Sequence, residues 1–300
     1  MAIMTIAMLW VPGIDALAKI LAATQSPGEI AWSRFLFQAS LLLPLVVWRA
    51  RRRPTGPVAS LHLQALRGVL IALTTLLFFA ALRYLPLAEA ISIFFVEPLI
   101  LTLLSAVFLG ETIGWRRIVG VLVGFAGALV IIRPSYEVFG LAAILPVGAA
   151  FCFGVYLVLT RKLATSTDPI TLQFVAGLSG LAAMSLALFA GSALEVEVLA
   201  ARWPDPREWL LMAGLGVVAT TGHLLVVQAF RLAPASLLAP FQYLEIISAT
   251  LLGLLLFGHF PDMWSWVGIS TIVASGLYVV HRERVRNREA GASMPGVDKA

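Results

Sequence analysis

The chain has 300 residues, of which 60% are hydrophobic and 12% are charged, and its formal net charge is +5 at pH 7. Apolar stretches of about 20 residues recur along it, and a stretch of that length can cross a bilayer as a helix, so the composition excludes an ordinary water-soluble domain. The single cysteine, Cys152, excludes a disulfide bond within the chain. We therefore interpret the chain as a polytopic membrane protein.

Ten membrane spans are predicted from the apolar stretches, which are separated by turns that contain proline, glycine or charged residues. Backbone polar groups must be satisfied internally in lipid, so each span is predicted to be a helix. The first span starts almost at Met1 and lacks the basic segment and cleavage site of a signal peptide, so we expect it to be retained. The spans cover residues 2–23, 28–48, 65–83, 86–109, 114–132, 139–160, 169–190, 208–230, 235–258 and 263–281.

Lysine and arginine residues are distributed unevenly over the segments that connect the spans. With the N-terminus in the cytoplasm, fifteen of them, Arg67 included, fall on cytoplasmic segments and four on external segments. Positive residues favour the cytoplasmic side, so we predict a multi-pass protein of a bacterial inner membrane with both termini in the cytoplasm. The basic charge then serves topology and contact with anionic headgroups, and nucleic acid is not an expected partner.

The sequence contains an internal duplication. Residues 81–132 align with residues 229–280 without a gap, at an offset of 148 positions (229 − 81). The matched residues include arginine, proline and glycine, and Glu97 meets Glu245. A weaker match at an offset of 142 positions places Pro27 on Pro169, so that the first span corresponds to the sixth.

This duplication predicts the architecture of the whole chain. Five spans separate equivalent positions, and an odd number inverts the second copy relative to the first. We predict an all-α membrane protein of ten transmembrane helices in two inverted five-helix repeats, residues 1–134 and 135–282, with a central cavity. A polar cytoplasmic tail is expected over residues 283–300. Inverted repeats of this kind place a substrate site near the middle of the membrane, between the two halves.

The motifs of the chain are similar to those of a known family. They are Asp15-Ala16-Leu17-Ala18-Lys19, Trp32-Ser33-Arg34-Phe35, Ala81-Leu82-Arg83-Tyr84-Leu85-Pro86, Glu97-Pro98, Phe108-Leu109-Gly110-Glu111 and the glycine-rich run Gly120–Gly127. With these motifs the chain resembles the drug/metabolite transporter superfamily, in particular its EamA-type ten-helix exporters. The resemblance implies secondary transport of amino acids, nucleosides, vitamins or other metabolites. One position departs from the family pattern, because the Gly-Glu expected after the ninth span reads Gly258-His259.

Three charged residues lie inside the first two spans. A charge near the centre of a bilayer costs roughly 2.5–3.5 kcal/mol on insertion scales, so each should face a cavity or a partner. Asp15 and Lys19 are four residues apart and share one helix face. Arg34 lies at about the same depth in the second span as Asp15 does in the first, so we expect the three residues to form one charged cluster. The cluster could be a buried ion pair that fixes the two spans, or it could contact a charged substrate.

Glu97 and Glu245 are the duplicated acids, and each falls near the middle of its span. Pro98 follows Glu97, and a proline at this place bends the helix and frees a backbone carbonyl. The two acids could bind a substrate amine or a proton. They could instead be protonated and form hydrogen bonds to neighbouring helices.

Further polar and aromatic side chains inside the spans are candidates for the cavity wall. His223 could contact a ligand or form a hydrogen bond between helices, and Gln242 and Tyr243 lie within one turn of Glu245. The aromatic residues could line the cavity or could face lipid. The complete set of expected substrate-binding residues is Trp10, Asp15, Lys19, Arg34, Phe78, Phe94, Glu97, Tyr156, His223, Gln242, Tyr243 and Glu245, and Phe95 is a further aromatic candidate.

The chain contains no motif of a hydrolase or metalloprotease, no metal-ligand spacing among its four histidines and no glycine-rich phosphate loop. We therefore expect neither an enzyme nor a bound metal, cofactor or ATP. We expect a monomeric secondary transporter that works by alternating access and exports small organic metabolites, aromatic and other neutral amino acids foremost, with protons as a candidate coupling ion. The alternatives are a carrier of a vitamin or nucleoside, such as riboflavin or a purine nucleoside, and, outside transport, a membrane sensor or an intramembrane enzyme.

Overall fold

The computed structural model describes residues 1–52, 60–109, 115–163, 169–232 and 241–292. Within these ranges the chain forms helices joined by turns, with no β-strand. Seven helical stretches are long and apolar enough to cross a membrane, and Ile118–Ile132 and Leu244–Phe257 are shorter apolar helices. The prediction of an all-α membrane protein is therefore confirmed.

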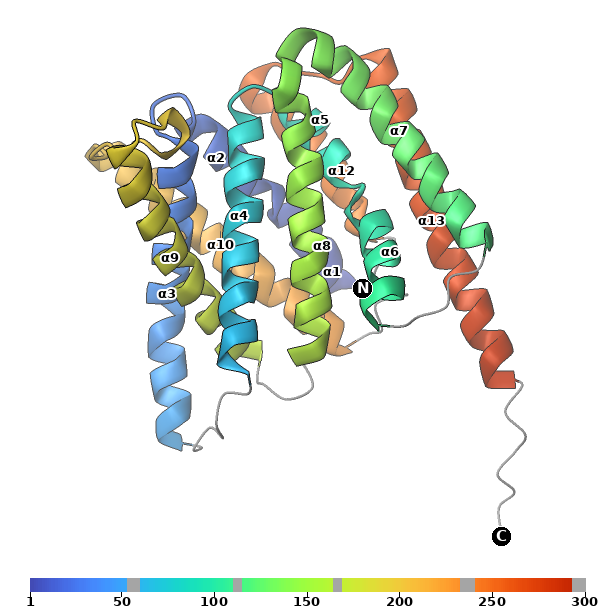
Figure 1. Cartoon of the computed structure of the whole chain (residues 1–300), viewed down its shortest axis with the longest axis horizontal. Coiled ribbons are helices and arrows are strands. Elements are labelled where there is room, and N and C mark those ends of the chain that lie inside the picture. The colour runs from blue at the N-terminus through green and yellow to red at the C-terminus, as the bar shows by residue number, and fades with distance from the viewer. Residues whose placement is uncertain (53–59, 110–114, 164–168, 233–240, 293–300) are drawn as a thin grey trace.

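Each predicted span contains at least one helix (Figure 1). The first half consists of α1 (Ala2–Trp10), α2 (Pro12–Leu21), α3 (Pro27–Arg52), α4 (Leu61–Leu82), α5 (Leu87–Phe94), α6 (Glu97–Leu109) and α7 (Trp115–Phe139). The second half consists of η1 (Gly140–Ile144), α8 (Leu145–Leu163), α9 (Pro169–Ala193), η2 (Glu197–Leu199), α10 (Pro206–Leu232), α12 (Leu244–Phe257) and α13 (Met263–Ala292). Helix α13 extends beyond the predicted end of the tenth span, so residues 283–292 of the expected polar tail are helical.

Three of the spans are interrupted in the middle. The first span breaks at Val11, between α1 and α2, where Pro12 cannot donate a backbone hydrogen bond. The fourth span breaks at Phe95 and Val96, because the ring of Pro98 conflicts with the carbonyl group of the residue four positions earlier. The ninth span is interrupted at Tyr243, directly before α12. Broken helices of this kind occur in membrane proteins where backbone lines a cavity rather than lipid.

The packing of α7 against α13 agrees with the predicted inverted repeats. These helices are equivalent at the offset of 148 positions, and they lie side by side along one edge of the bundle (Figure 1). A Cβ atom on Gly120 would clash with Val279, and a Cβ atom on the equivalent Gly268 would clash with Ile131, the equivalent of Val279. The two contacts are related by a two-fold axis, and the helices run antiparallel. The close approach of two backbones requires a residue without a side chain at both positions.

The other helix pairs follow the same symmetry. Helix α4 packs on α8 and α9, while its counterpart α10 packs on α2 and α3. Helices α3 and α9, which are equivalent to each other, also pack together. One large apolar core contains residues from both halves. The broken spans therefore meet in the middle of one bundle.

Candidate functional site

A cavity of about 190 Å³ lies in this bundle, next to the three helix breaks. Residues from both halves line it, and several come from the positions where the first, fourth and ninth spans are interrupted. The lining residues are Met8, Val11, Ile14, Asp15, Arg34, Ile71, Thr74, Thr75, Phe78, Phe79, Ile91, Phe94, Phe95, Glu97, Pro98, Phe153, His223, Val226, Gln242 and Glu245. Eight of the twelve expected site residues are among them: Asp15, Arg34, Phe78, Phe94, Glu97, His223, Gln242 and Glu245.

Two carboxyl groups enter the cavity from equivalent places. Glu97 is the first residue of α6, and Glu245 lies in the first turn of α12. The N-terminus of a helix carries a partial positive charge, which partly offsets the charge of a carboxylate there. The charges of Glu97 and Asp15 both act on Glu245. The cavity therefore concentrates acidic groups near the middle of the bundle.

Arg34 is the cationic residue among those that line the cavity. It is 7% exposed, its guanidinium donates through Nη1 to Thr75 Oγ1, and its Nη2 lies 3.5 Å from His223 Nε2. His223 Nδ1 lies 2.8 Å from the carbonyl oxygen of Ala219, so Nδ1 carries the hydrogen and Nε2 accepts from Arg34. Among the described residues, no atom accepts a hydrogen bond from Arg34 Nε. Arg34 thus retains one unused donor in a largely buried position.

The structure does not form the expected cluster of three charges. Asp15 and Arg34 interact electrostatically at the cavity, although within the described chain no ion pair forms between them. Lys19 points elsewhere, because its Nζ donates to the carbonyl oxygens of Leu82, at 2.9 Å, and Leu85, at 2.6 Å. Carbonyl groups at the end of a helix lack intrahelical partners, so the end of α4 offers acceptors that a sequence motif does not reveal. The expectation that Lys19 joins Asp15 is wrong.

Three expected aromatic residues also lie outside the cavity wall. Trp10 is 47% exposed, and its indole donates to Thr221 Oγ1 at 3.0 Å. Tyr243 packs against Phe95, with ring centroids 5.4 Å apart. Tyr156 stacks on Phe153, with centroids 5.4 Å apart, and so lies directly behind the wall.

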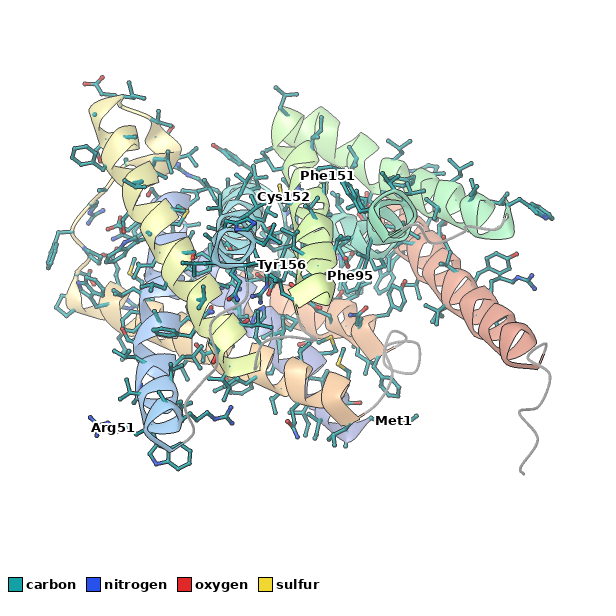
Figure 2. All side chains as sticks on the ribbon, turned by 60° about the horizontal axis from the view of Figure 1, so that its bottom comes forward. Met1, Arg51, Phe95, Phe151, Cys152 and Tyr156 are labelled. Atoms are coloured by element: carbon teal, nitrogen blue, oxygen red, sulfur yellow. The ribbon has the colours of Figure 1, made fainter. Side chains whose placement is uncertain are left out.

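Aromatic rings form a continuous row on one side of the cavity. Phe78 contacts Phe94 with centroids 5.3 Å apart, and Phe94 contacts Phe153 at 5.6 Å. Tyr156 extends the row beyond Phe153. Figure 2, which brings the lower end of Figure 1 forward, shows Tyr156 and Phe95 in the middle of the bundle. This side of the cavity is suited to an aromatic or other apolar group.

Sequence reasoning misses two important polar side chains. Thr75 binds Arg34, and the offset of 148 positions makes it the equivalent of His223, so the repeat itself could have identified it. The charge distribution assigns Arg67 to a cytoplasmic end, whereas the structure buries it between helices. Glu111, in the Gly110-Glu111 motif, lies outside the described residues. Within the described ranges, no three His, Cys, Asp or Glu side chains gather where they could hold a metal ion.

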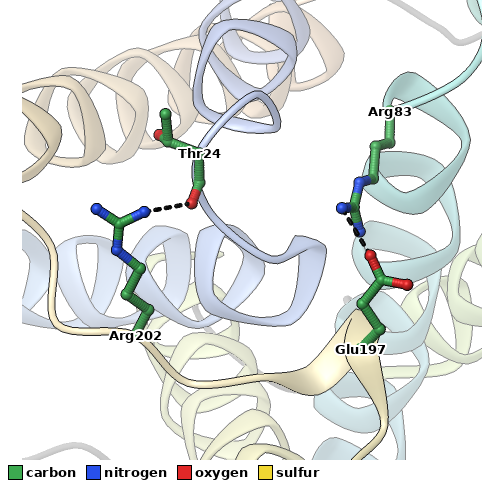
Figure 3. Close-up of polar contacts among 4 residues, drawn as sticks. All are labelled: Thr24, Arg83, Glu197 and Arg202. Atoms are coloured by element: carbon green, nitrogen blue, oxygen red, sulfur yellow. Dashed lines mark hydrogen bonds and ion pairs between the residues drawn. The ribbon is translucent and has the colours of Figure 1, made fainter.

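The end of the bundle that contains the 22–26 turn is crossed by polar contacts between the halves (Figure 3). Arg83 forms an ion pair with Glu197 at 2.8 Å, and Arg202 Nη1 donates to the carbonyl oxygen of Thr24 at 3.4 Å. Both pairs join the first half to the segment that follows α9. An exposed ion pair contributes at most about 1 kcal/mol, so the contact between Arg83 and Glu197 is weak enough to break when the bundle moves.

Comparison with known proteins agrees with this architecture. The sequence model of the EamA-like transporter family matches residues 1–133 and 140–280. A protein of Vibrio cholerae named "Riboflavin transporter" is 31% identical over 227 residues, which cover 74% of this chain and 72% of that protein. A protein of Rickettsia bellii named "S-adenosylmethionine uptake transporter" is 26% identical over 273 residues, covering 90% and 89% of the two chains. A solved crystal structure with 22% identity superposes with a TM-score of 0.61 over 95% of this chain and 97% of that one, which shows a shared fold.

Proposed function

Because the chain belongs to the EamA-like transporter family, we propose that it is a secondary carrier of metabolites that combine an α-amino acid group with an aromatic or other apolar side chain. Transport of a small metabolite follows from the family and from relatives that are named as transporters. The narrower substrate class is inferred from the chemistry of the cavity.

The observation that carries the proposal is the placement of opposite charges in one cavity. Arg34 offers a guanidinium with an unused Nε donor, which suits a substrate carboxylate. Glu97 and Glu245 are acidic groups on α6 and α12 and suit a substrate ammonium. The row formed by Phe78, Phe94 and Phe153 receives the side chain. A zwitterion with an apolar side chain therefore finds a complementary group for each of its parts.

The size of the cavity supports the same substrate class. Its volume is about 190 Å³, which is below the roughly 300–1,000 Å³ of sites that bind drug-sized ligands. An amino acid with a single aromatic ring suits this volume better than a vitamin with three fused rings. S-adenosylmethionine, which the name of the Rickettsia relative mentions, carries an α-amino acid group, but it is much larger than an amino acid with one ring, so the cavity volume does not favour it.

Riboflavin is the second candidate substrate. The observation in its favour is the 31% identity with the Vibrio cholerae protein named as a riboflavin transporter. The phenylalanine rings that line the cavity could stack on a flavin, but riboflavin carries neither an ammonium nor a carboxylate group for the charged residues. We rank it second for that reason.

The proposed mechanism is alternating access, in which the two halves rock around the cavity. Equivalent helices of the two halves face one another, so tilting one half against the other exposes the cavity at one end and closes it at the other. Export of the substrate from the cell is the direction that we expect. The net direction depends on the gradients and is measured separately from the substrate class.

Transport by purified protein in liposomes tests the proposal. Uptake and efflux of radiolabelled phenylalanine, methionine, S-adenosylmethionine, adenosine and riboflavin should be compared with the rates in empty liposomes. We expect phenylalanine and methionine to be carried and adenosine not to be carried. Transport of riboflavin without transport of any amino acid would contradict the amino-acid proposal and favour riboflavin as the substrate.

A further inference from the structure

Arg67 joins the two halves of the bundle at one end. This α4 residue is 2% exposed, and its Nε donates to Thr160 Oγ1 at 2.8 Å. Its Nη1 donates to the carbonyl oxygen of Leu172 at 2.9 Å, and its Nη2 donates to the hydroxyl of Tyr156 at 3.1 Å. The guanidinium also lies over the ring of Tyr156, 4.8 Å from its centroid. All three acceptors belong to α8 and α9, so every one of these bonds crosses between the halves.

The acceptors around Arg67 are all uncharged. Two are hydroxyl groups and one is a backbone carbonyl, and within the described chain no carboxylate pairs with Arg67. A buried cation is stable only while its hydrogen bonds are complete, because each lost bond leaves a charged donor without water. These bonds therefore hold the helices in one arrangement, and they can be exchanged for bonds to water if this end opens.

Arg67, Tyr156, Thr160 and Leu172, here called the Arg67 cluster, lie next to the cavity. Ile71, one turn further along α4, lines the cavity, and Tyr156 stacks on Phe153, which also lines it. Leu172 is 4% exposed and Tyr156 is 7% exposed, so the cluster excludes solvent at the end where α4 and α9 begin. The cluster thus lies between the cavity and that end of the bundle.

The equivalent place at the other end has the opposite chemistry. The offset of 148 positions places Leu215 on Arg67, and the offset of 142 positions places Ile14, Ala18 and Ile30 on Tyr156, Thr160 and Leu172. All four equivalents are apolar, are at most 4% exposed and belong to the main core. One end of the bundle therefore contains a buried polar network around a cation, and the equivalent place at the other end contains hydrophobic packing.

We propose that Arg67 is a gating residue, whose hydrogen bonds to Tyr156, Thr160 and Leu172 keep the cavity closed at this end and break whenever it opens there. The proposal concerns the movement of the carrier and does not depend on which metabolite is carried. Because the apolar equivalents lack such bonds, the two ends are expected to open with different ease, so the repeats are not interchangeable in the transport cycle.

The test measures access to the cavity from each end. In a Cys152→Ala background, Val226→Cys places one thiol on the cavity wall, since Val226 lines it. Labelling by a membrane-impermeant maleimide is followed in sealed right-side-out and inverted vesicles. The exposed positions of Ser60→Cys, at the start of α4, and Ser192→Cys, at the opposite end, report which face of the vesicle carries which end.

Arg67→Met removes all three bonds and retains an unbranched side chain, so labelling from the Ser60 end should rise by about tenfold, with no rise from the Ser192 end. Tyr156→Phe removes one acceptor and keeps the cation, and a rise of about threefold is expected from the same end. Leu215→Met, at the equivalent apolar position, conserves volume and is the matched control, for which neither rate should change.

Two results would overturn the proposal. One is unchanged labelling in both Arg67→Met and Tyr156→Phe. The other is an equal rise from both ends, which is the result expected if Arg67 only stabilises the fold. If Arg67→Met does not accumulate as a folded protein, Tyr156→Phe decides alone, because it leaves the guanidinium and two of its bonds in place.

Discussion

Phe95 and Tyr243 occupy equivalent positions in the two halves, and their rings pack against each other with centroids 5.4 Å apart. Two residues that are exchanged by a two-fold axis can contact each other only near that axis. Both also lie at the breaks of their spans, Phe95 directly after α5 and Tyr243 directly before α12. The pseudo-symmetry axis therefore passes beside the cavity, between the first turns that carry Glu97 and Glu245.

The position of Tyr243 leads to a prediction about stability. A Cβ atom on Gly276 would overlap the phenol of Tyr243, so Gly276→Ala must displace this ring and disturb its contact with Phe95. We expect Gly276→Ala to lower the stability by about 1–3 kcal/mol, as overpacking commonly does. Thermal unfolding in detergent measures the change. In a Tyr243→Leu background the same substitution should cost much less, and an equal cost in both backgrounds would contradict the contact.

The two duplicated acids lead to a prediction about pH. Glu97 and Glu245 line one cavity, and the charge of Glu97 acts on Glu245, so we expect them not to be ionised together. Glutamine mimics the protonated acid, so Glu97→Gln and Glu245→Gln should leave the protein folded and flatten the pH dependence of transport between about pH 5 and 8. Flux in liposomes at several pH values measures this. Variants that both retain the wild-type rate and pH profile would assign the acids a structural role.

Asp15 and Arg34 should be coupled, whereas Asp15 and Lys19 should not be. Asp15→Asn leaves Arg34 without the carboxylate that acts on it, and adding Arg34→Gln should recover part of the loss. Lys19 binds the carbonyl groups of Leu82 and Leu85 instead, so its substitution should be additive with Asp15→Asn within about 0.5 kcal/mol. Double-mutant cycles of thermal stability measure both couplings. Equal coupling energies in the two cycles would contradict the structure, in which Lys19 is not a partner of Asp15.

The orientation in the membrane leads to a prediction about labelling in intact cells. The charge distribution predicts that Ser60 faces the cytoplasm and Ser192 the outside. Both residues are exposed and lie at opposite ends of the bundle. In a Cys152→Ala background, an impermeant thiol reagent should label Ser192→Cys and spare Ser60→Cys. The reverse pattern would invert the whole assignment of the ends.

Much of the fold could be predicted because its determinants are local or repeated. Apolar length sets the spans, and the offset of 148 positions relates Gly120 to Gly268 and Glu97 to Glu245 within the sequence itself. The helix break before Glu97 follows from Pro98 alone. No proline follows Tyr243 at the position equivalent to Pro98, so the break there has no such local cause. The internal repeat predicts it, because Tyr243 aligns with Phe95.

The parts of the site that sequence did not predict depend on contacts between distant helices. The spacing of Asp15 and Lys19 places them on one helix face, yet it does not show that α4 ends nearby and offers carbonyl acceptors to Lys19. In the sequence Arg67 resembles any basic residue near a helix end. Its burial could not be predicted, because its hydrogen-bond acceptors come from the distant helices α8 and α9. Trp10 shares its span with lining residues but forms its hydrogen bond with Thr221 at an exposed place.

The central claim is that one cavity recognises the carboxylate and the ammonium group of an amino acid, with Arg34 as the partner of the carboxylate. Counterflow in liposomes tests it most directly, with phenylalanine compared with phenethylamine, which lacks the carboxylate, and with 3-phenylpropionate, which lacks the ammonium. We expect both analogues to be carried at least about tenfold more slowly, as the loss of a buried charged partner implies. We also expect Arg34→Gln to reduce phenylalanine counterflow to the rate of phenethylamine. Equal rates for all three compounds, or a preference for phenylalanine that Arg34→Gln leaves unchanged, would contradict the claim.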